Sequence, residues 1–213
     1  MTRPLLYLWV VGITAAFSIL DHMDGLVSGV AAIACFFFAL LTILNGQVLV
    51  ATLSTAVFGA SGGGTSSQQR SSWANGGAMF LSFMVATLGL KLRLVHTPRP
   101  IAGWFRSSFL AVPIFDTTLV TISRSRRGLL PFALPGQDHA AHRLANLRLG
   151  QRGAVLVIYG VGFLCGVLAV LLSRLFFERP LVFGAALALT TLAGVAVLEN
   201  LAYERQQSAK EAS

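Results

Sequence analysis

The sequence predicts an all-α, polytopic membrane protein, built as a bundle of about seven transmembrane helices. Of its 213 residues, 55% are hydrophobic and only 11% are charged, whereas soluble domains contain about 25% charged residues. A globule of this size cannot remove so much apolar surface from water, because its surface stays large relative to its mass. These proportions exclude a soluble enzyme, a disordered chain and a disulfide-rich secreted domain.

Seven apolar stretches predict the membrane helices. About 20 residues cross the hydrocarbon core as a helix, and a helix satisfies its own backbone hydrogen bonds in lipid. Three stretches are shorter than this, so their ends are less well defined. In chain order the stretches are 5–20, 26–44, 47–60, 78–95, 107–122, 153–173 and 180–198.

The connections divide this single membrane domain, residues 1–198, into helices and loops. Asn45-Gly46 predicts a tight turn, because both residues tolerate turn conformations. Residues 61–77 form a polar Gly/Ser-rich loop, residues 123–152 a long basic loop, and residues 199–213 a polar C-terminal tail.

The net charge of +8 comes from loop residues between the apolar stretches. Basic loops of this kind face anionic lipid headgroups, so the bilayer is the expected partner and nucleic acid is not. Counting seven crossings places nine Lys/Arg on the side of the 61–77 and 123–152 loops and seven on the other. Because the 123–152 loop is so densely basic, we expect its side to be cytoplasmic.

Asp21 and Asp24 are the first candidate functional residues, because acids beside membrane helices are costly and often functional. If the helix continues through them, their i,i+3 spacing places both carboxylates on one face. Two carboxylates suit a hard divalent cation that keeps several waters and takes phosphate oxygens. The alternative interpretation is a polar helix boundary that caps the next segment.

Asp116 and the segment around His139 and His142 are the other candidates. Asp116 lies inside an apolar run, where an acid is either functional or paired, for example with a loop arginine. His139, His142 and Arg143 suit phosphate or metal binding, although amphipathic surface helices produce such triplets by chance. By topology all these residues fall on one membrane face, which indicates phosphoryl transfer and disfavours a transporter with a midplane site.

The motifs resemble those of the polyprenyl-phosphate N-acetylhexosamine-1-phosphate transferases, integral membrane enzymes of the bacterial cell envelope. Four motifs occur in the family's order over nearly the whole chain. They are Leu8–Thr14 with Asp21-x-x-Asp24-Gly25-Leu26-x-x-Gly29, Ala78–Phe83, Pro113–Thr117, and Asp138-His139-x-x-His142-Arg143-Leu144.

The resemblance implies transfer of a sugar-1-phosphate from a UDP-N-acetylhexosamine to a polyprenyl phosphate lipid, with release of UMP, in the bacterial inner membrane. It assigns Asp21 and Asp24 to Mg²⁺, or alternatively Mn²⁺, and Asp116 to a catalytic role. Substrate binding falls to a set of four residues. It comprises Asn75, His139, His142 and Arg143. The pathway branch is the first lipid-linked sugar of O-antigen, teichoic acid or similar polymers, and a homodimer remains open.

Three departures define an alternative. The family's N-terminal Asp-Asp pair has no counterpart, Ala15 and Ser18 stand where the family has asparagines, and Asn75 stands where it has an acid. We therefore expect the chain to be the C-terminal portion of a longer transferase, with about residues 61–74 as a frame-shifted or decayed stretch. The alternative is an inactive membrane remnant that keeps the fold and at most binds lipid phosphate or a partner.

Overall fold

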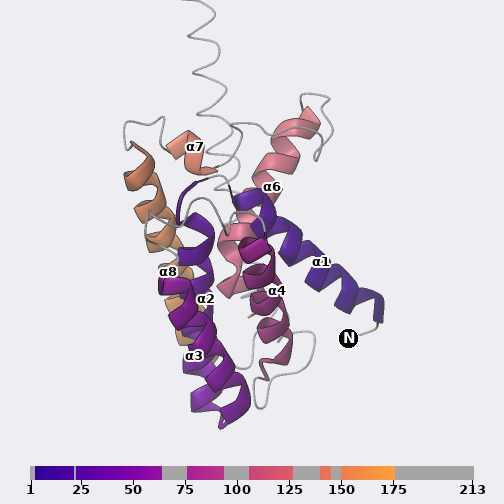
Figure 1. Cartoon of the computed structure of the whole chain (residues 1–213), viewed down its shortest axis with the longest axis vertical. Helices are drawn as coiled ribbons and strands as arrows, with labels where there is room; N and C mark the ends of the chain where they lie inside the picture. Colours follow the sequence, from indigo (N-terminus) through magenta and orange to yellow (C-terminus); the bar gives the residue numbers. More distant parts are fainter. Residues whose placement is uncertain are drawn as a thin grey trace, which may run out of the picture.

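Every secondary-structure element that the structure describes is an α-helix, which confirms the predicted helical bundle. The structure is a computed structural model (Figure 1). Helices α2 and α8 are long and apolar enough to cross a membrane, and α1, α3 and α4 are shorter apolar helices. The described residues are 3–21, 23–63, 76–93, 106–126, 140–144 and 150–175.

The N-terminal half forms an oblique helix followed by a helical hairpin. Helix α1 spans Arg3–Leu20, α2 spans Leu26–Leu44 and α3 spans Val48–Gly63. The predicted turn at residues 45–46 reverses the chain between α2 and α3, and Gly46 adopts a positive φ of 69°. Glycine populates this left-handed region at little cost, so the local sequence itself sets the hairpin.

The second half adds three long helices and one short one. Helix α4 spans Gly76–Lys91, α6 spans Ala111–Arg126, α7 spans Ala140–Leu144 and α8 spans Gly150–Leu175. The predicted basic loop is therefore shorter than expected, because α6 extends into it, α7 interrupts it and α8 begins before it ends. The last apolar stretch and the polar tail lie outside the described residues.

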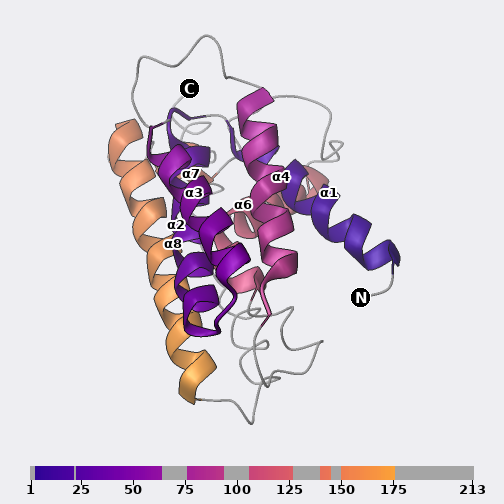
Figure 2. The ribbon, with the colours of Figure 1, turned by 60° about the horizontal axis from the view of Figure 1, so that its bottom comes forward.

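Helix α2 lies at the centre of the bundle. In its apolar stretch 67% of the residues are buried, compared with 22% in α8. Helices α3, α8 and α4 pack around α2, while α1 runs obliquely away from the bundle toward the N-terminus (Figures 1 and 2). The largest core side chains include Phe17, Leu26 and Phe38. The outward face of α8 carries exposed Leu156, Val161, Leu164, Leu168 and Leu171, as expected for contact with lipid.

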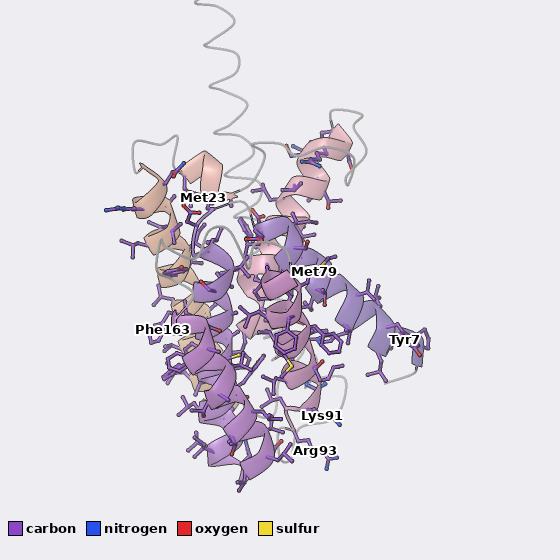
Figure 3. The ribbon with its side chains drawn as sticks, in the orientation of Figure 1. Tyr7, Met23, Met79, Lys91, Arg93 and Phe163 are labelled. Carbon is purple, nitrogen blue, oxygen red and sulfur yellow. The ribbon has the colours of Figure 1, made fainter. Side chains whose placement is uncertain are left out.

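Specific polar contacts join segments far apart in sequence. The indole Nε1 of Trp9 on α1 donates to the Ala86 carbonyl of α4 over 3.0 Å. Just after the C-terminal end of α4, the Arg93 backbone N–H donates to the side chain of Gln47 over 3.0 Å. Lys91 and Arg93 lie at the end of the bundle away from Met23 (Figure 3). The two ends of the bundle therefore differ, with Met23 and the two aspartates beside it at one end.

Helices α2 and α8 fit together by placing aromatic rings over glycines. A Cβ built at Gly29 on α2 would overlap the ring of Tyr159 on α8. A Cβ built at Gly166 on α8 would overlap the ring of Phe37 on α2. Glycine lets two membrane helices approach closely, and the two contacts together set how far along α2 helix α8 sits.

Replacing Gly166 with alanine should destabilise the bundle by about 1–3 kcal/mol, because the new methyl group overlaps Phe37 and a packed core must then rearrange. Gly160 on the same helix is the matched control, since nothing lies within 4 Å of a Cβ built there. Thermal unfolding in detergent should show a lower midpoint for Gly166→Ala and an equal or higher one for Gly160→Ala. Equal midpoints for both variants would contradict the ring-on-glycine fit.

Candidate functional site

The turn between α1 and α2 carries both predicted metal-binding carboxylates. Asp21 and Asp24 are exposed, whereas Met23 between them is buried in the core. Helix α1 ends at Leu20 and α2 begins at Leu26, so the two acids do not sit on one continuous helix. Their exposure on the same short connection, rather than a shared helix face, is what keeps both available to a ligand.

Gly25 ends this turn and starts α2. Its φ of 77° and ψ of −11° lie in the left-handed region, which side chains with a Cβ rarely adopt. The carbonyl of Gly25 accepts three hydrogen bonds. They come from the backbone N–H of Gly29 over 2.9 Å, from Oγ of Ser28 over 2.9 Å and from Oη of Tyr159 over 2.6 Å. The backbone next to Asp24 is therefore held from both its own helix and α8.

The environment of Asp21 opposes its negative charge. Partial burial of the carboxyl raises its pKa above the ordinary value, because a charged form loses hydration when protein surrounds it. A cation placed beside the carboxyl would favour the ionised form again.

Asp116 lies inside the protein with 2% of its surface exposed. Its Oδ1 accepts a hydrogen bond from the backbone N–H of Ala140 over 2.8 Å. Ala140 is the first residue of α7 and packs with Leu119 of α6 in a small apolar cluster. A carboxylate that accepts from the first N–H of a helix makes a charge-assisted bond. The structure thus places Asp116 where it holds the start of α7.

Helix α7 carries the predicted histidine–arginine segment. Ala141 is fully buried and belongs to the same large core cluster as Met23, while Leu144 packs against that cluster. Helix α7 and the turn before α2 lie at the same end of the bundle (Figures 1 and 2). The side chains of His142 and Arg143 lie outside the described part of the structure.

Two further predicted substrate-binding residues, Asn75 and His139, also lie outside the described residues, and their roles stay predictions. The structure brings Asp116 together with the backbone of α7, and it places Asp21 and Asp24 in one turn at the same end of the bundle as α7. These come from segments more than 100 residues apart, as the sequence numbers of Asp24 and Ala140 show.

The described residues contain three acidic side chains, those of Asp21, Asp24 and Asp116. Within these parts of the chain, no group of three or more His, Cys, Asp or Glu side chains gathers as a metal cluster. Mg²⁺ keeps several waters and takes only one or two carboxylates together with substrate phosphates. Asp21 and Asp24 supply two exposed carboxylates, the number that such an ion takes, whereas the Asp116 carboxylate is buried beside α7.

A shallow cavity of about 490 Å³ lies at the other end of α2, lined among others by Ile43, Gln47, Val48 and Thr52. It is mostly apolar and contains none of the predicted site residues. We therefore do not assign it to the chemistry of the aspartates.

Tyr159 is the residue near the site that sequence reasoning missed. It lies in an otherwise apolar stretch of α8 and donates to Gly25, 134 residues earlier in the chain. A tyrosine hydroxyl inside apolar surroundings needs a hydrogen-bond partner, and this was the available signal. The identity of that partner depends on the packing of α8 on α2.

Comparison with known proteins gives two relatives. The chain is 33% identical over 176 residues to an undecaprenyl-phosphate N-acetylglucosaminyl 1-phosphate transferase, as it is named, of Bacillus subtilis, with 81% of this chain and 49% of that protein covered. It is 30% identical over 169 residues to a glycosyltransferase, as it is named, of Streptomyces coelicolor, covering 78% of this chain and 40% of that protein. No family model matches the chain, and no solved structure gives a significant match.

The chain spans about half the length of the Bacillus subtilis relative and 40% of the length of the Streptomyces coelicolor relative. The match nevertheless runs through most of this chain, and the predicted motifs and the helical bundle agree with it. The chain therefore belongs to the polyprenyl-phosphate N-acetylhexosamine-1-phosphate transferase family.

Proposed function

We propose that this chain is the part of a membrane transferase that moves a sugar-1-phosphate, GlcNAc-1-phosphate in the first instance, from a UDP-sugar to undecaprenyl phosphate. The observation that carries the proposal is the arrangement at one end of the bundle. Two exposed carboxylates, Asp21 and Asp24, lie at the same end as α7, which Asp116 holds by its first backbone N–H. The name of the Bacillus subtilis relative supports the choice of lipid and sugar.

In this proposal an oxygen of the lipid phosphate attacks the β-phosphorus of the UDP-sugar. The bond from that phosphorus to the bridging oxygen breaks, and UMP leaves with the electron pair. Asp21 and Asp24 would hold Mg²⁺, which neutralises developing charge on phosphate oxygens when bound. The exposure of both carboxylates leaves room for the water and phosphate ligands that this ion requires.

Residues of α7, together with His139 just before it in the sequence, would act on the diphosphate. A guanidinium such as that of Arg143 binds phosphate oxygens through paired N–H groups, and His139 and His142 supply further donors. The protein's contribution to phosphoryl transfer is mainly positioning and charge neutralisation. The hydrogen bond between Asp116 and Ala140 supports this role because it fixes where the helix that carries His142 and Arg143 begins.

Removal of divalent metal is the direct test. Membranes that contain the chain should transfer label from UDP-N-acetylglucosamine to undecaprenyl phosphate, and a chelator should abolish transfer that added Mg²⁺ then restores. The lipid product and UMP should form in equal amounts. Transfer that persists in full under chelation would contradict the metal assignment.

The alternative of an inactive remnant makes a different prediction in the same assay. It predicts no transfer at any metal concentration, although the folded chain still binds undecaprenyl phosphate. A vesicle-binding measurement with and without that lipid, made beside the transfer assay, separates the two functions. Transfer dependent on Mg²⁺ would exclude the remnant.

A further inference from the structure

The hydroxyl of Tyr159 reaches the turn that carries Asp21 and Asp24 from a separate helix. It donates to the carbonyl of Gly25, the residue that follows Asp24, over 2.6 Å. Tyr159 is partly buried on α8, and the bond links positions 134 residues apart. Nothing in the predicted chemistry assigns a role to this residue.

The two glycines after Asp24 shape the place where Tyr159 binds. Gly25 provides the left-handed backbone, and a Cβ added there would lie 3.6 Å from the Tyr159 hydroxyl, an ordinary contact. Gly29 provides the space, since a Cβ there would overlap Cζ, Cε1 and Oη of the ring. The tyrosine is therefore seated on the first turn of α2 by its ring and bonded to it by its hydroxyl.

Further contacts hold α8 in place beside the hydroxyl bond. Phe37 of α2 fills the space left by Gly166 of α8, and Gly162 of α8 lies close to Val112, with a built Cβ 3.2 Å from Cγ2. Closely packed helices cannot slide without breaking such contacts. Because several separate contacts hold α8 against α2, no one of them alone sets the position of the Tyr159 hydroxyl.

We propose that Tyr159 is a positioning residue for the metal-binding turn, holding the Gly25 carbonyl so that the Asp24 carboxylate keeps one direction. Glycine passes easily between left-handed and right-handed backbone conformations, so Gly25 is the point at which the turn can change shape. The bond from Tyr159 opposes that change. The inference rests on the proposed function of Asp21 and Asp24 as metal ligands.

Tyr159→Phe separates the hydroxyl from the packing, because the ring still covers Gly29. Hydrogen exchange of the backbone amides of residues 24–29, measured on the intact chain in detergent, should become faster by roughly fivefold to tenfold, as expected for loss of one hydrogen bond. The Kd for Mn²⁺, measured by electron paramagnetic resonance as a probe of the Mg²⁺ site, should rise by about 10- to 100-fold, the effect typical of outer-shell partners.

Phe37→Leu is the matched control, since it alters the other ring-on-glycine contact of the same two helices. It should lower the thermal unfolding midpoint yet leave the Mn²⁺ Kd and the relative exchange of residues 24–29 unchanged. A purely structural role for Tyr159 predicts the same pattern for Tyr159→Phe as for Phe37→Leu, and that result would overturn the proposal.

The outcomes also separate this inference from the proposed function. If hydrogen exchange at residues 24–29 is unchanged in Tyr159→Phe, the positioning role is overturned. The role is also overturned if exchange becomes faster while the Mn²⁺ Kd stays the same, provided that Mn²⁺ binding depends on Asp24. In a third outcome, exchange becomes faster in Tyr159→Phe, but the wild type binds no Mn²⁺ or binds it equally well after Asp24→Asn. That result supports Tyr159 as holding the turn and removes the metal function of the aspartates.

Discussion

Asp24→Asn should lower the rate of Mg²⁺-dependent sugar-1-phosphate transfer by about 1,000-fold. The change keeps the size of the side chain and removes its charge, and Asp24 is exposed in the turn before α2, where no core packing depends on it. A catalytic metal contributes several kcal/mol of transition-state stabilisation, and about 4 kcal/mol corresponds to this loss of rate. The measurement is transfer of label from UDP-N-acetylglucosamine to undecaprenyl phosphate in membranes at saturating Mg²⁺.

Ser18→Ala provides the control for Asp24→Asn. Ser18 is exposed in the last turn of α1, close to the aspartates. Its backbone carbonyl accepts a hydrogen bond from the backbone N–H of Asp21, and this carbonyl is kept in the variant. Its transfer rate should stay within about twofold of the wild type, because surface changes away from caps and cores have small effects. Equal rates for Asp24→Asn and Ser18→Ala would refute the metal site.

Asp116→Ala should detach α7 from α6 and lower transfer by about 100-fold. The variant leaves the N–H of Ala140 without its carboxylate acceptor in a buried place, which costs about 1–3 kcal/mol. Displacement of a substrate-binding element by about 1 Å can reduce the rate by this factor. Hydrogen exchange of residues 140–144 and thermal unfolding in detergent measure the structural part, and the transfer assay measures the rest.

Asp116→Asn distinguishes positioning from direct catalysis. The amide oxygen of asparagine still accepts from Ala140, so exchange at residues 140–144 should stay close to that of the wild type. Retained transfer in Asp116→Asn would then assign the residue to holding α7. Loss of transfer with α7 still protected would support the catalytic role predicted from the sequence, and wild-type protection in Asp116→Ala would contradict the anchoring role.

Helix positions were predictable because they depend on local composition. Six of the seven apolar stretches correspond to α1, α2, α3, α4, α6 and α8, and the seventh lies outside the described residues. The turn at residues 45–46 was also predictable, since Gly46 takes the positive φ that its neighbours cannot easily adopt. The end of α6 was less predictable, because the polar residues Ser123 and Arg124 are buried there by tertiary contacts.

The candidate site divides in the same way. The spacing of Asp21 and Asp24 before a glycine marked the turn, and both residues are exposed there. Of the two interpretations of this segment, the continuous helix with both carboxylates on one face does not hold, because α1 ends at Leu20 and α2 begins at Leu26. The boundary between two helices, which the apolar stretches 5–20 and 26–44 also indicated, is what the structure shows. Position in an apolar run identified Asp116 as unusual, but its partner, the N–H of Ala140, depends on how α7 packs against α6.

Taken alone, the sequence determined that this protein is a bundle of apolar helices, because hydropathy acts on each segment separately. It also predicted that Asp21, Asp24 and Asp116 lie on one membrane face, which stays a prediction. Only the tertiary structure decided that Asp116 holds α7 and that Tyr159 holds Gly25. Both contacts join residues distant in sequence, 24 and 134 positions apart. Such pairs form only when whole helices pack, and the fit of rings over Gly29 and Gly166 is a property of two surfaces that no single segment contains.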